Sequence, residues 1–212
     1  MPMSPREDTA KARKDFDKAG LVILGGGTVS FKSKDPADIR ARFEYAKTAG
    51  MPLIVAGPNR DVLPLLEPYV KEYGIKLAVH NHGPEDKQFP TPESILEVIG
   101  GMDPRIGLCM DVGHTARTGD DVVESIRKAG ARLLDMHIKD LADFKDKDSQ
   151  VPVGDGKMPI PAIFRELKKM NYAGGVMLEY EIEEANPIPG MLKSFAYMRG
   201  VLAGMSASGE QK

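Results

Sequence analysis

The 212-residue chain contains 42% hydrophobic and 28% charged residues, as an ordinary globular protein does, which excludes disorder as its main state. It has 29 Lys and Arg against 31 Asp and Glu, so the net charge of −2 disfavours a nucleic-acid partner. No stretch approaches the roughly 18 continuous apolar residues of a membrane helix, and residues 1–17 lack the apolar run of a secretory signal. We expect a single domain over residues 1–212 in the cytoplasm, with no nucleic-acid or membrane partner. An export signal upstream of Met1 is the alternative for its location.

Short apolar runs alternate with amphipathic stretches along the chain, and Gly, Pro or Asp marks most of the boundaries. A helix is expected over residues 7–19, before the first strand. The strand-like runs begin at Gly20, Met51, Ile75, Arg105, Arg132 and Gly174. The helix-like segments between and after them are residues 36–48, 61–73, 92–99, 120–129, 161–170 and 189–203. Two of these helices begin at a capping residue followed by proline, Asp35-Pro36 and Thr91-Pro92.

Repeated strand–helix units predict a parallel sheet, because each helix returns the chain to the start of the next strand. The predicted strand starts lie 24 to 42 residues apart. This spacing is close to the roughly 31 residues per unit of an eight-unit barrel. The predicted class is therefore α/β, a TIM-type (β/α) barrel of which about six units are visible.

All four histidines fall at or just beyond the carboxyl ends of predicted strands: His80, His82, His114 and His137. Asp111, Asp140, Glu179 and Glu181 lie at similar places. In parallel α/β folds these strand ends form the ligand-binding face. A single histidine there would as often be a surface or core residue, but all four together with carboxylates indicate a site for Mn²⁺, Mg²⁺, Co²⁺ or Zn²⁺.

Residues 20–185 resemble the xylose isomerase-like barrel superfamily of sugar phosphate isomerases and epimerases. The resemblance rests on KLAVHNHG, GLCMDVGHT, DMHIKD, VPVGDGK and YAGGVMLEYE, which occur in that order. It implies a (βα)₈ barrel whose metal ligands are His80, Asp111, His137 and Glu179. It also implies that His114 and Lys139 contact substrate oxygens.

The chain departs from this family pattern in length. Its six units match the third to the eighth, so the first two strands and the first helix are missing. A barrel of six strands would expose two parallel edges. We expect the missing strands to be encoded upstream of this sequence, with a second subunit of a homo-oligomer covering the gap as the alternative.

A second departure concerns His80, which stands where many relatives have a glutamate. In sugar 3-epimerases that glutamate is one of two acid/base groups, and only Glu179 of the pair is present here. Glu85 or Asp86, in the loop after His80, would supply a second carboxylate. We expect His82 and Glu85 to bind substrate together with His114 and Lys139.

These residues predict a metal-dependent isomerase or epimerase acting on a small sugar, a sugar phosphate or a keto-sugar. Glu179 is the expected base, which removes a proton next to the carbonyl, and His114 or Lys139 is the expected acid. Dehydration of a keto-sugar by the same site is one alternative, and a non-catalytic, decayed barrel is another. Nuclease activity is disfavoured, because the nuclease branch of the superfamily has more metal-binding histidines and a basic groove.

Two further features have mainly structural interpretations. Gly25, Gly26 and Gly27 are expected to form a turn after the first strand, because no helix follows promptly as a phosphate-binding loop requires. Cys109, the only cysteine, is expected to be a buried apolar residue.

Overall fold

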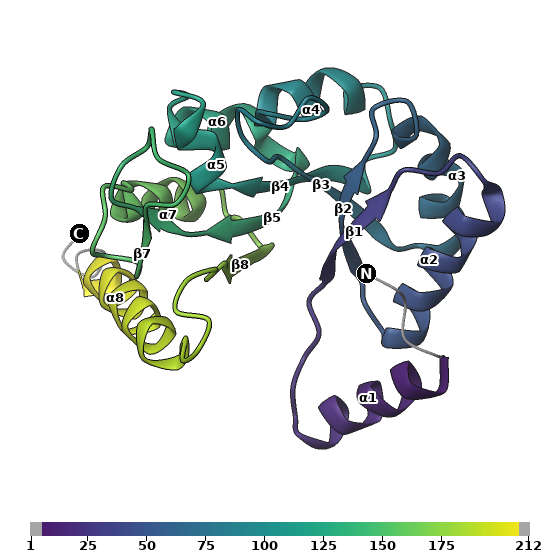
Figure 1. The fold of residues 1–212 in the computed structure, drawn as a ribbon, viewed down its shortest axis with the longest axis horizontal. Coiled ribbons are helices and arrows are strands. Elements are labelled where there is room, and N and C mark those ends of the chain that lie inside the picture. Colours follow the sequence, from purple (N-terminus) through teal and green to yellow (C-terminus); the bar gives the residue numbers. More distant parts are fainter. Residues whose placement is uncertain (1–5, 208–212) are drawn as a thin grey trace.

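A computed structural model describes residues 6–207, and its centre is a six-stranded parallel sheet. The strands, in their order across the sheet, are β1 (Gly26–Phe31), β2 (Leu53–Pro58), β3 (Lys76–His80), β4 (Ile106–Asp111), β5 (Leu133–Ile138) and β8 (Gly175–Leu178). The sheet curls into an arc with β1 and β8 at its two ends (Figure 1). Within residues 6–207 these two strands do not pair with each other. The prediction of a partial (β/α) barrel is confirmed.

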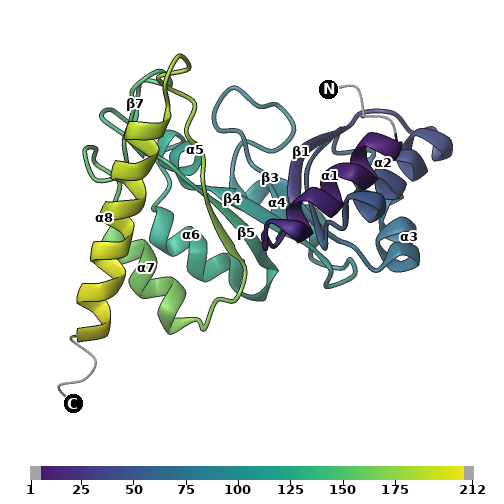
Figure 2. The same cartoon turned by 90° about the horizontal axis from the view of Figure 1, so that it is seen from below.

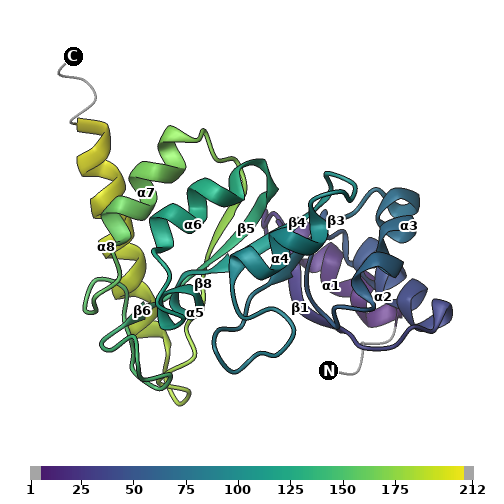
Figure 3. The same ribbon diagram turned by 90° about the horizontal axis from the view of Figure 1, so that it is seen from above.

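Most of the helices lie on the outer face of the arc, whereas the first helix lies away from the sheet (Figure 1). The helices are α1 (Arg6–Lys18), α2 (Pro36–Ala49), α3 (Leu63–Tyr73), α4 (Pro92–Ile99), α5 (Val112–Arg117), α6 (Val122–Ala129), α7 (Ile160–Lys169) and α8 (Ile188–Ala207), with a 3₁₀ turn at Gly130–Arg132. α6 packs beside α7 (Figure 3), while α1 packs on α2 and α8 on α7 (Figure 2). None of these helices has the length and apolar character needed to cross a bilayer.

The predicted helix starts at Asp35 and Thr91 are confirmed. The Asp35 carboxylate accepts a hydrogen bond from the backbone N–H of Ala37. The Thr91 hydroxyl accepts one from the N–H of Ser94, whose own hydroxyl accepts one from Thr91 N–H. This reciprocal capping satisfies amides that the first helical turn leaves without a partner.

The two faces of the sheet are buried in different ways. The outer face packs on the helices and forms the main core, which includes Leu77, Val79 and Met110. The inner face carries a smaller apolar cluster of Leu53, Val55, Ala78 and Cys109. Because side chains alternate along a strand, the residues two positions after Ala78 and Cys109 also lie on the inner face. Cys109 is buried, as predicted.

The first strand was predicted in the wrong place. Residues 21–25 are not in a strand, and the side chain of Val22 is 80% exposed. The strand is instead Gly26–Phe31, so Gly26 and Gly27 lie in β1 and do not form the predicted turn. A Cβ atom on Gly27 would lie 2.2 Å from the carbonyl oxygen of Val55. Gly27 therefore allows β1 to approach β2 closely.

Two short antiparallel strands follow β5: β6 (Asp140–Leu141) and β7 (Gln150–Val151). They were not among the predicted elements. The Asp140 side chain organises the loop that follows. Its buried carboxylate accepts hydrogen bonds from the N–H groups of Gly154, Gly156 and Met158 at 2.9 to 3.1 Å. Asp140 therefore anchors this loop to the end of β5.

Replacing Asp140 with alanine should lower the free energy of unfolding by about 3 kcal/mol, because several loop amides would lose a charged acceptor. Urea denaturation of the purified variant measures the change. Asp143→Ala is the matched control, since Asp143 is exposed and, within residues 6–207, its side chain accepts a hydrogen bond only from the nearby Lys145 N–H. Equal midpoints for the two variants would contradict the anchoring role of Asp140.

Candidate metal centre

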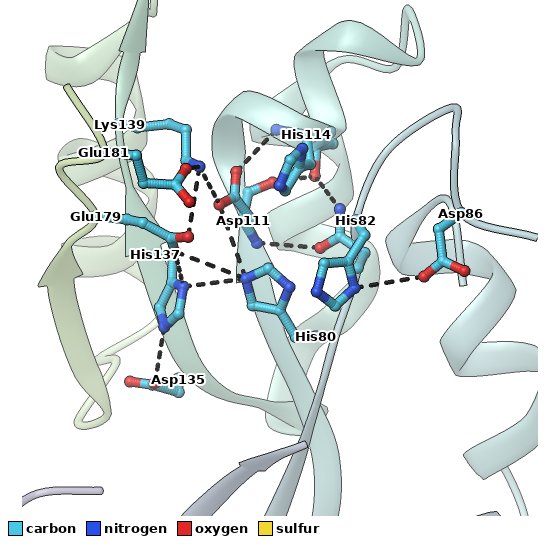
Figure 4. A network of polar contacts seen from close by, with 12 residues as sticks. His80, His82, Asp86, Asp111, His114, Asp135, His137, Lys139, Glu179 and Glu181 are labelled. Atoms are coloured by element: carbon cyan, nitrogen blue, oxygen red, sulfur yellow. Dashed lines mark hydrogen bonds and ion pairs between the residues drawn. The ribbon is translucent and has the colours of Figure 1, made fainter. Parts of the chain in front are cut away.

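Four side chains from four strands meet at the carboxyl edge of the sheet (Figure 4). His80 ends β3, Asp111 ends β4, His137 lies near the end of β5, and Glu179 follows β8. One donor atom from each lies within 4.8 Å of the others. His80 Nε2 is 3.0 Å from His137 Nδ1, and 3.8 Å from both Asp111 Oδ2 and Glu179 Oε2. The structure thus brings together the four residues predicted as metal ligands.

Strand register explains this convergence. Asp111 pairs with His137 across the β4–β5 ladder, so their side chains lie next to each other on the same face. Asp111 is also held by its surroundings. Its backbone N–H donates to Asn81 Oδ1 at 3.0 Å, and its Oδ1 accepts the N–H of His114 at 2.8 Å as the N-cap of α5. Only Oδ2 of Asp111 is left to face the centre.

Asp111 Oδ2 and Glu179 Oε2 are buried, and among the described residues their polar partners all belong to this centre: Lys139 lies beside Asp111 Oδ2, and His137 pairs with Glu179 Oε2. Burial of carboxylate oxygens is costly unless an opposite charge offsets it, and such atoms commonly bind an ion or a water molecule. Two imidazoles and two carboxylates are a suitable ligand set for Mn²⁺, Co²⁺, Zn²⁺ or Mg²⁺. The residues present therefore fit a divalent cation.

Lys139 contributes a positive charge beside the centre. Its side chain is 5% exposed, and Nζ lies 3.2 Å from Asp111 Oδ2, 3.5 Å from Glu179 Oε1 and 2.8 Å from Glu181 Oε2. Burial alone would lower the pKa of Lys139, but the carboxylates of Asp111 and Glu179 raise it above its usual value. Lys139 is therefore an ammonium ion at neutral pH.

The partnership of Glu181 with Lys139 was not predicted. Glu181 belongs to a run of acidic residues that ordinarily would be a solvated surface. The spacing of Glu181 from Glu179 could have indicated this partnership, because residues two apart in extended chain point to the same side.

The pKa values of His137 and Glu179 shift in opposite directions, because the two side chains are in contact. Burial would lower the pKa of His137, but its hydrogen bond to Glu179 and the charge of that carboxylate raise it. Burial would raise the pKa of Glu179, but the hydrogen bonds from His137 and His80 hold it well below its usual range. On the far side of His137, Asp135 Oδ2 lies 4.0 Å from Nε2. The contact between His137 and Glu179 therefore favours the ionised form of Glu179.

His82 and His114 lie beside the four converging residues but outside the group. The ring centroid of His82 is 4.4 Å from that of His80 and 5.9 Å from that of His114. Burial lowers the pKa of both His82 and His114, so both imidazoles are neutral at pH 7. All four histidines of the chain therefore lie close together, two inside the four-residue group and two beside it (Figure 4).

The two candidate carboxylates of the loop after β3 are paired elsewhere. Glu85 pairs with Arg117, and its side chain is 59% exposed. Asp86 Oδ2 lies 3.4 Å from His82 Nδ1 (Figure 4). Neither joins the four-residue group, so the structure does not bring a third carboxylate into it from this loop. The role of Glu85 in substrate binding stays a prediction.

A cavity of about 370 Å³ adjoins the centre on the side of β1 and β2. Its lining is mostly polar and includes His80, His82, Thr28, Ser30, Lys32 and Asn59. Hydroxyl, amide and charged groups around a space of this size suit a small molecule with many hydroxyl groups.

Comparisons with known proteins place these features in a family. A family model described as xylose isomerase-like TIM barrel matches residues 4–201. An inosose dehydratase of Mesomycoplasma hyopneumoniae is 30% identical over 154 residues, which cover 63% of this chain and 50% of that protein. The chain thus spans about half the length of this curated relative.

Two solved structures share the fold. The first is the IOLI protein, described with a binding zinc atom, which has a TM-score of 0.78 at 20% sequence identity. The match covers 92% of this chain and 82% of the IOLI chain. The second is a D-tagatose 3-epimerase-like protein with a TM-score of 0.75 at 20% sequence identity. This match covers 97% of this chain and 86% of the other chain. With the family match over most of its length, the chain belongs to the xylose isomerase-like TIM barrel family.

Proposed function

We propose that this chain is part of a metal-dependent lyase that removes water from a polyhydroxylated ketone, such as a keto-sugar or a cyclic keto-polyol. The observation that carries the proposal is the convergence of His80, Asp111, His137 and Glu179 around one point, with Lys139 beside it. A divalent cation bound there would polarise the ketone and acidify the neighbouring C–H bond.

Glu179 is the proposed base. Its carboxylate is ionised, because the pKa is held well below its usual range, and Oε1 is not engaged by the imidazoles. An ionised carboxylate beside the substrate can accept the proton from the carbon next to the ketone.

Lys139 and His114 act on the substrate oxygens. The buried ammonium of Lys139 stabilises negative charge that develops on an oxygen when the proton leaves. The hydroxyl on the next carbon then departs and needs a proton, which the Lys139 ammonium supplies, while the neutral His114 binds the departing oxygen. The net change is loss of one water molecule.

Two observations support dehydration over the alternatives. Epimerisation by two bases needs a second acid/base group on the opposite face, and His80 occupies the position of the second glutamate in the family pattern. The curated relative with 30% identity is an inosose dehydratase. Isomerisation or epimerisation is the second candidate, since it begins with the same proton removal and a D-tagatose 3-epimerase-like protein shares the fold.

Metal binding provides the first test. Mn²⁺ or Co²⁺ should raise the melting temperature, because a ligand that binds only the folded state stabilises it by about 2.7 kcal/mol at a concentration 100-fold above Kd. His137→Ala should abolish this shift. Differential scanning fluorimetry at increasing metal concentration measures it.

His82→Ala is the control for that experiment, because His82 is a neighbouring histidine outside the four-residue group and 39% exposed. Its metal-dependent shift should match that of the parent chain. The metal centre would be refuted by a parent chain whose melting temperature does not respond to either metal.

Product analysis tests the reaction. With an inosose and Mn²⁺ or Co²⁺, mass spectrometry should detect a product lighter by one water, and Lys139→Met should reduce kcat by about 100-fold or more. Lys145→Met, at an exposed lysine of the following loop, should retain the parent rate. A product of unchanged mass and altered configuration would instead support the second candidate.

A further inference from the structure

We propose that Gln150 is a positioning residue, whose side-chain amide holds Glu179 and Glu181 at the metal centre. The functional part of this inference rests on the proposed metal centre. The contacts on which it depends lie outside the centre itself, in the β6–β7 pair.

The amide of Gln150 binds the backbone on both sides of Tyr180. Its Nε2 donates to the carbonyl oxygen of Glu179 at 2.5 Å, and its Oε1 accepts the N–H of Glu181 at 3.0 Å. A carboxamide has one edge with a donor and an acceptor side by side, much as an extended residue of a strand presents its own N–H and C=O on one edge. Gln150 therefore binds this segment as a neighbouring strand would.

The β5–β8 ladder explains why this position is open. Ile138 pairs with Leu178, and Glu179 N–H donates to the Ile138 carbonyl at 2.9 Å. If the parallel ladder continued, the backbone N–H of Asp140 would bond the carbonyl of Glu179, and its C=O would bond the N–H of Glu181. Asp140 instead leaves the sheet and pairs with Val151 in β6–β7. The Gln150 side chain bonds the two groups that the backbone of Asp140 leaves open.

The contact with Gln150 affects two carboxylates of the site, those of Glu179 and Glu181, which both follow β8. Glu179 belongs to the four-residue group, and Glu181 Oε2 binds Lys139 Nζ at 2.8 Å. β8 is a four-residue strand at the edge of the described sheet, so few other bonds hold the segment that follows it. Loss of the Gln150 side-chain amide would let the carboxylates of Glu179 and Glu181 shift together.

Gln150→Met tests the inference, because methionine has a similar length and cannot form the two hydrogen bonds. Loss of a group that orients a metal ligand typically weakens metal binding 10- to 100-fold. We expect the Kd for Co²⁺ to rise about 10-fold or more, measured from the visible absorption of Co²⁺, with an altered band shape. Hydrogen exchange at the Glu181 amide should become faster in the metal-free variant.

Gln88→Met is the matched control. Gln88 also binds a backbone amide through its side chain, since its Oε1 accepts the N–H of Arg60 at 2.8 Å, but it makes no hydrogen bond to the segment after β8. Its Co²⁺ Kd and the exchange at Glu181 should equal those of the parent chain. Circular dichroism establishes that each variant is folded.

An unchanged Co²⁺ Kd in Gln150→Met would overturn the positioning role, even with faster exchange at Glu181. A parent chain that binds no Co²⁺ would refute the proposed metal centre instead. In that case the exchange at Glu181 still decides whether Gln150 holds the segment: faster exchange supports this contact and unchanged exchange overturns it.

Discussion

The burial of two carboxylates at one point is the constraint on which the site depends. Asp111 is fully buried and Glu179 is largely so, and one oxygen of each has polar partners only within the centre among the described residues. Removing an ionised carboxylate from water costs several kcal/mol unless an opposite charge offsets it. Lys139 offers one such charge. A divalent cation would complete the compensation.

The sheet supplies this arrangement through simple geometry. Four strand ends bring side chains from distant parts of the chain to one edge, and alternation places the apolar Ala78 and Cys109 directly beneath His80 and Asp111. The apolar layer keeps water from approaching the centre from below, which strengthens the electrostatic interactions above it. The cavity beside β1 and β2 remains the polar side of the site.

The features that the sequence predicted well depend on burial in the centre of the sheet. The apolar runs of β2 to β5 lie between two neighbouring strands, and the convergence of His80, Asp111 and His137 follows from where those runs end. β1 was misplaced because GGTVSF is a small, partly exposed edge strand, whereas the more apolar residues before it pair with nothing in the sheet. The roles of Asp140, Gln150 and Glu181 depend on where the chain turns after β5 and β8. Hydrophobic periodicity contains no information about such turns.

The site is therefore not equally rigid throughout. His80, Asp111 and His137 come from strands that have a neighbour on each side, whereas Glu179 follows the edge strand β8 and depends on the carbonyl of Ile138 and the amide of Gln150. A ligand at a loosely held edge contributes to metal affinity only to the extent that its backbone is fixed beforehand, because ordering it on binding costs conformational entropy. The loop anchored by Asp140 meets this need, since it fixes the strand that carries Gln150. Folding of the β6–β7 segment and assembly of the centre are thus coupled through Glu179.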